Sequence, residues 1–181
     1  DREGEQGKRS LTKKIFAEDA EGNIIINFWN IDGETINYVD QRGKHAHWGQ
    51  RRLKVPKGSQ KYDMPKGQPT KPFIPWELVE MYRKSEKVET LYLTEGAFKA
   101  YYAAKLGVVV MGLASITCFK NREGKIYEDV RKFTGRCQVQ NIVILHDGDC
   151  RDISLKAVNE SLELTERPRL FLAMAEQMRK L

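Results

Sequence analysis

The sequence predicts an α/β fold, in which a mostly parallel sheet flanked by helices is preceded by a small, basic, β-rich subdomain. From about residue 88 onward, short apolar runs alternate with amphipathic segments of helical periodicity, which is typical of strand–helix units in a parallel sheet. Residues 23–87 instead carry strand-like runs, turns and clustered Lys and Arg. Of the 181 residues, 40% are hydrophobic, which is enough to form a buried core.

The N-terminal elements follow from strand-like runs and turn residues. Residues 1–22 are mainly polar and indicate a linker or a frayed end. Apolar runs at residues 24–28 and 35–39 flank an Asp-Gly turn, and this pattern favours a β-hairpin. A further strand is predicted at residues 51–55. The proline-rich stretch that follows is predicted to be a loop, and residues 76–85 are predicted to form a helix.

The second half contains the predicted elements of the parallel sheet. The strands are expected at residues 91–94, 108–113 and 140–145. The helices are expected at residues 97–106, 126–133, 153–164 and 170–181. The first helix is expected to end at Gly107 and the second near Gly135, and Pro168 is expected to separate the last two.

The charge of the chain favours polyanionic partners. The formal net charge is +6, and the basic residues gather between residues 42 and 71, interleaved with Trp48 and Tyr62. This distribution is compatible with a nucleic-acid track, and equally with a solvated surface. The basic residues of this stretch are Arg42, Lys44, Arg51, Arg52, Lys54, Lys57, Lys61, Lys66 and Lys71.

Other classes of protein fit the sequence poorly. The longest apolar stretch, residues 106–114, is too short to span a membrane and lies in the middle of the chain. No membrane partner and a cytoplasmic location are therefore expected. Cys118, Cys137 and Cys150 are too widely spaced for a zinc knuckle and are expected to be reduced.

Two acidic motifs fall where predicted strands end. Glu95 and Gly96 follow the first strand of the parallel half, and Asp147, Gly148 and Asp149 follow the third. Because the carboxyl ends of parallel strands share one edge of the sheet, three carboxylates are expected to converge there. Such a cluster favours Mg²⁺, which accepts carboxylate, water and phosphate oxygens. Taken singly, each motif is also explained by a helix cap or a turn.

Both motifs carry a resemblance to a known family. The runs Leu91-Tyr-Leu-Thr-Glu-Gly-Ala-Phe-Lys-Ala100 and Ile142-Val-Ile-Leu-His-Asp-Gly-Asp149 resemble the Toprim domain of bacterial replicative primases, topoisomerases and some nucleases. Upstream, Gln50-Arg-Arg-Leu53 and Lys61-Tyr-Asp-Met-Pro65 are similar to the basic subdomain that precedes Toprim in bacterial-type primases. The nearest likeness is to Toprim-like domains in primases and primase-helicases of phages, plasmids and other mobile elements.

The resemblance implies a Rossmann-like Toprim domain over residues 88–181 and a DNA primase-type nucleotidyltransferase activity. The chain is expected to make RNA primers on single-stranded DNA from nucleoside triphosphates, within a replication protein that has a replicative helicase as a further partner. Glu95 would be the catalytic acid or base and a ligand of Mg²⁺ or Mn²⁺, together with Asp147 and Asp149. Gly96, Gly148 and His146 would lie near the site.

Basic side chains are the expected contacts of the template or nucleotide. If residues 51–55 form a strand, Arg51 and Arg52 point to opposite faces, so at most one of them faces a groove. Lys99 stands where replicative primases place an acid, one helical turn after Glu95, where it could balance carboxylates or contact phosphate. The expected nucleic-acid or nucleotide ligands are Arg51, Arg52, Lys54, Lys61 and Lys99.

Two alternative functions remain open. A Toprim-family nuclease would use the same carboxylates without nucleoside triphosphates. A non-catalytic nucleic-acid-binding module is favoured by Lys99, which replaces a family acid. His45 and His47 alternate as on one face of a strand, and without a third ligand they indicate surface or RNA-contacting histidines rather than zinc.

Overall fold

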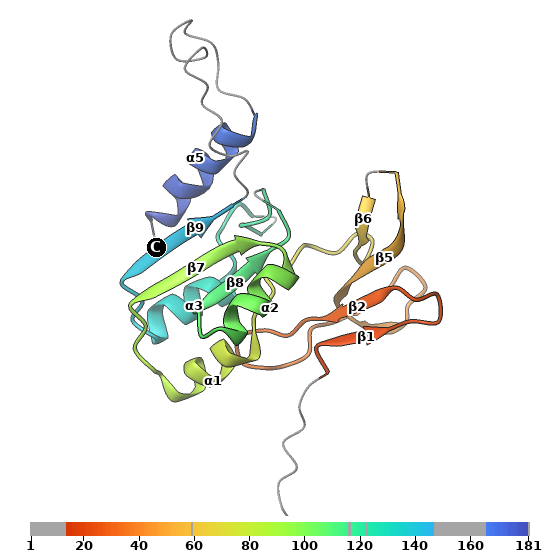
Figure 1. Cartoon of the computed structure of the whole chain (residues 1–181), viewed down its shortest axis with the longest axis horizontal. Helices are drawn as coiled ribbons and strands as arrows, with labels where there is room; N and C mark the ends of the chain where they lie inside the picture. Colours follow the sequence, from red (N-terminus) through yellow and green to blue (C-terminus); the bar gives the residue numbers. More distant parts are fainter. Residues whose placement is uncertain (1–13, 59, 116, 122, 147–165, 181) are drawn as a thin grey trace, which may run out of the picture.

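The computed structural model of the chain describes residues 14–58, 60–115, 117–121, 123–146 and 166–180. It contains an antiparallel β-rich part and a parallel sheet with helices (Figure 1). The strands are β1 (Phe16–Glu18), β2 (Ile24–Asn27), β3 (Asn37–Val39), β4 (His45–His47), β5 (Gly49–Lys57), β6 (Gln60–Asp63), β7 (Thr90–Glu95), β8 (Val110–Leu113) and β9 (Asn141–Leu145). The helices are α1 (Trp76–Lys84), α2 (Ala97–Lys105), α3 (Glu128–Arg136) and α5 (Glu166–Met178).

The parallel sheet confirms the predicted α/β class. Its described strands lie in the order β8-β7-β9, and β7 pairs in parallel with both neighbours. Leu91 and Leu93 on one face of β7 are fully buried with side chains of α1, α3 and α5. On the other face, Tyr92 packs with Val110 and with the small residues of α2. Helices thus cover both faces, as the alternating sequence pattern requires.

The β-rich part is a four-stranded antiparallel sheet, β1-β2-β5-β6, with a separate β3-β4 pair. Its core side chains Phe28 and Trp48 pack with Phe73 and with helix α2 of the parallel half. Phe73 also exchanges two backbone hydrogen bonds with Gly112 of β8, with N–O distances of 2.7 and 2.9 Å. One continuous packing arrangement therefore joins the two halves of the described chain.

The predicted hairpin at residues 24–28 and 35–39 is wrong in its pairing. Only one isolated bridge, Trp29 with Thr35, remains of it. Strand β2 instead pairs with β1 and β5, and β3 pairs with β4. Ile26 in β2 is fully buried, and the strand lies between β1 and β5 in the sheet. Residue alternation predicts a strand but does not select its partner.

Three local predictions also need correction. Phe16–Glu18, expected in a linker, forms β1, because Phe16 stacks on Phe98 of α2. Gln60–Asp63, expected in a loop, forms β6 along β5. Helix α5 begins at Glu166, before Pro168, whose missing N–H is tolerated in a first turn. Helix α3 ends at Arg136, next to Gly135, near which its end was predicted. The helix predicted at residues 153–164 lies outside the described residues.

Asp129 of α3 links the helix to the β-rich part and predicts a pH dependence. Its carboxylate accepts a hydrogen bond from the Ile31 N–H at 2.9 Å. Burial raises the pKa of Asp129, and the Ile31 N–H and the charges of Lys71 and Lys132 oppose this shift. The folded state therefore holds this proton more tightly than the unfolded chain, so the contribution of Asp129 to stability declines as pH rises above the ordinary value of 3.8.

Replacing Asp129 by asparagine should remove this decline, because an asparagine oxygen still accepts the Ile31 N–H without a charge. Urea unfolding of Asp129→Asn over a pH series should give a variant more stable than the wild type at neutral pH. The difference should vanish below the pKa of the unfolded carboxyl. Glu123→Gln, at an exposed position outside the surroundings of Asp129, is the control. If the stability of Asp129→Asn and of the wild type depended on pH in the same way, Asp129 would not be the source of the decline.

Candidate active site at the carboxyl edge of the parallel sheet

Glu95 is the last residue of β7, the central strand of the described sheet. Gly96 follows it and precedes α2 with φ 93°, a backbone conformation that side chains with a Cβ rarely adopt. The Gly96 N–H donates to the Leu113 carbonyl of β8 at 2.6 Å. The glycine thus turns the chain sharply from strand to helix, which leaves Glu95 at the carboxyl edge with a side chain that is 21% exposed.

Gly112 of β8 packs closely against the same strand–helix turn. A Cβ at this position would lie 2.8 Å from the Gly96 carbonyl oxygen and 3.0 Å from the Ala100 Cβ. Only a residue without a side chain lets the start of α2 approach β8 this closely. Gly112 therefore positions the strand–helix turn that holds Glu95.

His146 lies beside Glu95 at this edge. The register of β9 with β7 pairs Thr94 with Leu145, so the next residues of the two strands, Glu95 and His146, are also neighbours. His146 Nδ1 is 3.7 Å from Glu95 Oε2, and the imidazole is 1% exposed. This distance is too long for a hydrogen bond, so the contact is electrostatic and attractive when the imidazole is protonated.

Helix α5 fixes the imidazole of His146 from the opposite side. His146 Nε2 lies 3.2 Å from the Met174 Sδ. The Phe171 ring meets the imidazole edge to face, with ring centroids 6.2 Å apart. His146 therefore lies beside Glu95, near the expected site, and also packs against helix α5.

The fit of the expected magnesium ion depends on residues outside the described ranges. Asp147, Gly148 and Asp149 follow His146 in the sequence and lie outside them. Within the described part of the chain, no three His, Cys, Asp or Glu side chains are grouped as metal ligands would be. There, the edge supplies Glu95 as one hard oxygen ligand, which fits Mg²⁺ only in combination with both aspartates.

Lys99 and Arg52 bring positive charge to the same helix. Lys99 is exposed on α2, one turn after Glu95. The Arg52 guanidinium of β5 lies 5.7 Å from the Phe98 ring centroid, on the first turn of α2, and donates to the Tyr62 hydroxyl at 2.7 Å. These contacts place Arg52, within β5, against the helix that starts at the candidate site.

The other basic residues predicted to bind nucleic acid or nucleotide lie in two different environments. Arg51 donates to Asp63 at 3.0 Å and lies 3.6 Å from Asp19, so its charge is already compensated. The hydrogen bond with Asp63 raises the pKa of Arg51. Arg52, Lys54 and Lys61 instead line one pocket of about 300 Å³ beside β2 and β5. Three of the predicted ligands therefore line one pocket, whereas Arg51 is paired with Asp63 and Asp19.

The two histidines of β4 lie on the exposed surface, as predicted. His47 Nδ1 is 2.6 Å from the Asn37 side-chain oxygen on β3. Neither histidine belongs to a group of three potential metal ligands among the described residues.

A hydroxyl-rich loop at the carboxyl end of β8 was not predicted to belong to the site. Ser115 Oγ lies 2.9 Å from Thr117 Oγ1 and 3.2 Å from Cys118 Sγ. The loop follows Leu113, which pairs with Glu95, so it lies at the same edge of the sheet. The signal in the sequence was the pair of hydroxyl residues Ser115 and Thr117 shortly after a predicted strand.

Comparisons with known proteins add no family assignment. No protein-family model, curated protein or solved structure matched this chain. Within the described residues, no helix has both the length and the apolar character needed to cross a bilayer.

Proposed function

We propose that this chain is a Toprim-type, primase-like nucleotidyltransferase that makes RNA primers on single-stranded DNA. The supporting observation is the position of Glu95 at the carboxyl end of the central parallel strand, beside the strand that leads into Asp147 and Asp149. Ligands of parallel α/β sheets bind at this edge. The basic pocket of Arg52, Lys54 and Lys61 supplies the charge for a nucleic-acid partner.

In this proposal, Glu95, Asp147 and Asp149 hold Mg²⁺ or Mn²⁺. When bound, such an ion neutralises phosphate charge and aligns a hydroxyl with the phosphate that it attacks. Glu95 also accepts or returns a proton near the reacting phosphate. His146, held by Met174 and Phe171, positions the Glu95 carboxylate and excludes water from its inner side.

The basic residues guide the polyanion toward this edge. Arg52 lies against Phe98 on α2, so a strand bound in the pocket of Arg52, Lys54 and Lys61 has a short path to Glu95. Lys99, on the exposed side of the same helix, contacts a phosphate of the template or of the incoming nucleotide.

Removing two charges from this pocket should weaken DNA binding and reduce its salt dependence. For Arg52→Ala with Lys61→Ala, the slope of log affinity against log salt should fall by about 0.7 for each phosphate that the protein no longer neutralises. Lys84→Ala with Lys125→Ala removes the same charge from two other exposed positions. Fluorescence anisotropy with a labelled single strand over a salt series measures both slopes. Equal slopes for the two double variants would exclude the pocket as the binding site.

The function is tested by incubating the chain with single-stranded DNA, labelled nucleoside triphosphates and Mg²⁺ or Mn²⁺. Primer products from the wild type that are absent from the Asp147→Asn, Asp149→Asn double variant support the proposal. Metal-dependent degradation of the template without nucleotides would identify a nuclease. DNA binding with neither reaction would identify a binding module.

A further inference from the structure

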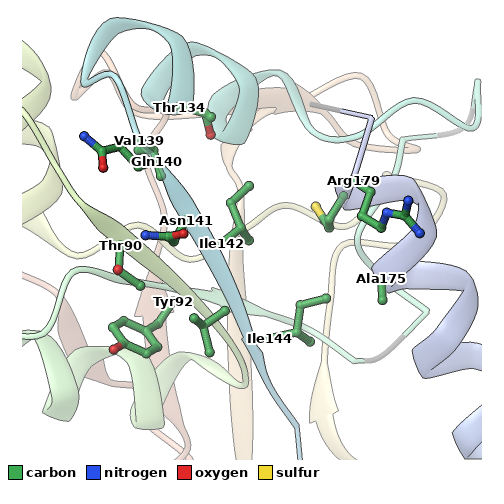
Figure 2. Close-up of a pocket in the computed structure, with 12 residues that line it drawn as sticks. Thr90, Tyr92, Thr134, Val139, Gln140, Asn141, Ile142, Ile144, Ala175 and Arg179 are labelled. Atoms are coloured by element: carbon green, nitrogen blue, oxygen red, sulfur yellow. The ribbon is translucent and has the colours of Figure 1, made fainter.

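Two pockets of the described structure differ in charge. The pocket of about 690 Å³ beside β9, shown in Figure 2, has Arg179 as its one charged residue among the described residues that line it. The pocket of about 300 Å³ beside β2 and β5 is lined by Arg52, Lys54 and Lys61, and no carboxylate is among its described lining residues. Three cations without an acid in one small pocket favour an anionic occupant.

Arg52 of this pocket differs from its neighbour Arg51 in the kind of group that holds it. Arg51 pairs with carboxylates, since it lies 3.6 Å from Asp19 and 3.0 Å from Asp63. Arg52 is exposed, and among the described residues its side chain contacts neutral aromatic side chains instead of a carboxylate. Neutral contacts hold a guanidinium in place without compensating its charge, so Arg52 keeps its full charge for a ligand.

The aromatic contacts of Arg52 come from a strand and a helix. Tyr62 of β6 is its register partner across the antiparallel sheet, and Phe98 lies in the first turn of α2, where it stacks on Phe16. The Arg52 Cζ is 5.4 Å from the centroid of the Tyr62 ring and 5.7 Å from that of the Phe98 ring. Both distances are within the range of cation–π attraction. Two rings on different elements therefore restrict the orientation of the guanidinium.

The hydrogen bond between Arg52 and Tyr62 leaves one edge of the guanidinium open. It joins Arg52 Nη1 to the Tyr62 hydroxyl at 2.7 Å. The parallel N–H groups of Nε and Nη2 lie along another edge, and within the described part of the chain they donate to no other group. Two parallel N–H groups of a planar guanidinium match two oxygens of one phosphate. An orientation that is fixed before binding also lowers the entropy lost on binding.

We propose that Arg52 binds one backbone phosphate of single-stranded DNA through its Nε and Nη2 edge, and that Tyr62 is the residue that positions it. This inference rests on the proposed function, which places the DNA strand at this pocket. Lys54 and Lys61, in the same pocket, act on neighbouring phosphates as point charges. DNA affinity therefore depends on the planar shape of the Arg52 side chain as well as on its charge.

Replacing Arg52 by lysine separates shape from charge. Arg52→Lys should bind a labelled single strand at least about tenfold more weakly than the wild type, because the bidentate contact is lost. The slope of log affinity against log salt should stay the same, because the charge is kept. Arg83→Lys is the control, since it makes the same change at an exposed arginine that lies over Trp76 and does not line the pocket. Fluorescence anisotropy without metal or nucleotide measures binding independently of primer synthesis.

A double-mutant cycle tests the positioning role of Tyr62. Tyr62→Phe removes only the hydroxyl and should weaken binding by about twofold to tenfold, because Arg52 then loses more side-chain freedom when it binds. In the Arg52→Lys background the same substitution should have no further effect, since no guanidinium remains to be oriented. Tyr102→Phe, at a side chain that is 67% exposed on α2, is the control for loss of a hydroxyl.

The proposal is supported if Arg52→Lys binds more weakly at an unchanged salt slope and the effect of Tyr62→Phe is confined to the arginine background. Equal DNA affinity of Arg52→Lys and the wild type overturns it, and leaves the proposed function to the test of primer synthesis. An equal effect of Tyr62→Phe in both backgrounds overturns the positioning role. A wild type that binds no single-stranded DNA overturns this proposal and the proposed function together.

Discussion

Replacing Glu95 by glutamine is expected to abolish primer synthesis while the chain still folds and binds single-stranded DNA. Glutamine keeps the size of the side chain but removes the negative charge and the ability to accept a proton. Loss of an acid–base group alone lowers a rate by about 10²-fold to 10⁴-fold, and loss of a cation ligand adds to this. Product formation from labelled nucleotides, measured at saturating DNA, gives the ratio of the two rates.

The control for this variant is Glu123→Gln, which makes the same chemical change at a side chain that is 69% exposed and forms a salt bridge with Lys125. Its primer synthesis should equal that of the wild type. Anisotropy measurements on both variants should give unchanged DNA affinity, because the proposed binding pocket lies on the β-rich part. Full primer synthesis by Glu95→Gln would show that this carboxylate has no part in the reaction.

The second large effect is expected at Gly112, where one added methyl group should destabilise the protein. An alanine Cβ there would lie 2.8 Å from the Gly96 carbonyl oxygen, and neither backbone can yield without moving α2 or β8. Overpacking of this kind costs about 1–3 kcal/mol. Because the moved turn also carries Glu95, primer synthesis should fall even under conditions where Gly112→Ala remains folded.

Gly135→Ala is the matched control, since the same methyl group is added where no atom lies within 4 Å. Gly135 lies inside α3, where alanine is favoured over glycine by about 0.5–1 kcal/mol. Urea unfolding should therefore show opposite signs for the two substitutions. Two variants with the same change in the free energy of unfolding would mean that the close approach at Gly112 has no energetic consequence.

The sequence was sufficient to predict the three described strands of the parallel half, and the helices α2 and α3, because their signals are local and periodic. Runs such as Leu91 to Thr94 are buried on both faces and are followed by amphipathic helices, so strand and helix positions can be inferred without knowledge of distant contacts. The position of Glu95 followed from the same logic, since a residue after a parallel strand lies at the carboxyl edge.

The pairing of the β-rich part could not be predicted because it depends on contacts between distant residues. Phe16 forms a strand since it stacks on Phe98 of α2, a contact that no local pattern encodes. The separation of Arg51 from the basic pocket likewise depends on Asp19 and Asp63, which lie on two other segments. At the site, contact of His146 with Met174 depends on the docking of α5.

The most direct test of the proposed site is the binding of Mn²⁺ to the full chain, measured by isothermal titration calorimetry without DNA or nucleotide. We expect binding to the wild type that is lost in Glu95→Gln and in the Asp147→Asn, Asp149→Asn double variant, and retained in Glu123→Gln. Equal binding by all four proteins, or no binding by the wild type at millimolar Mn²⁺, would contradict a cation site at the carboxyl edge of the sheet.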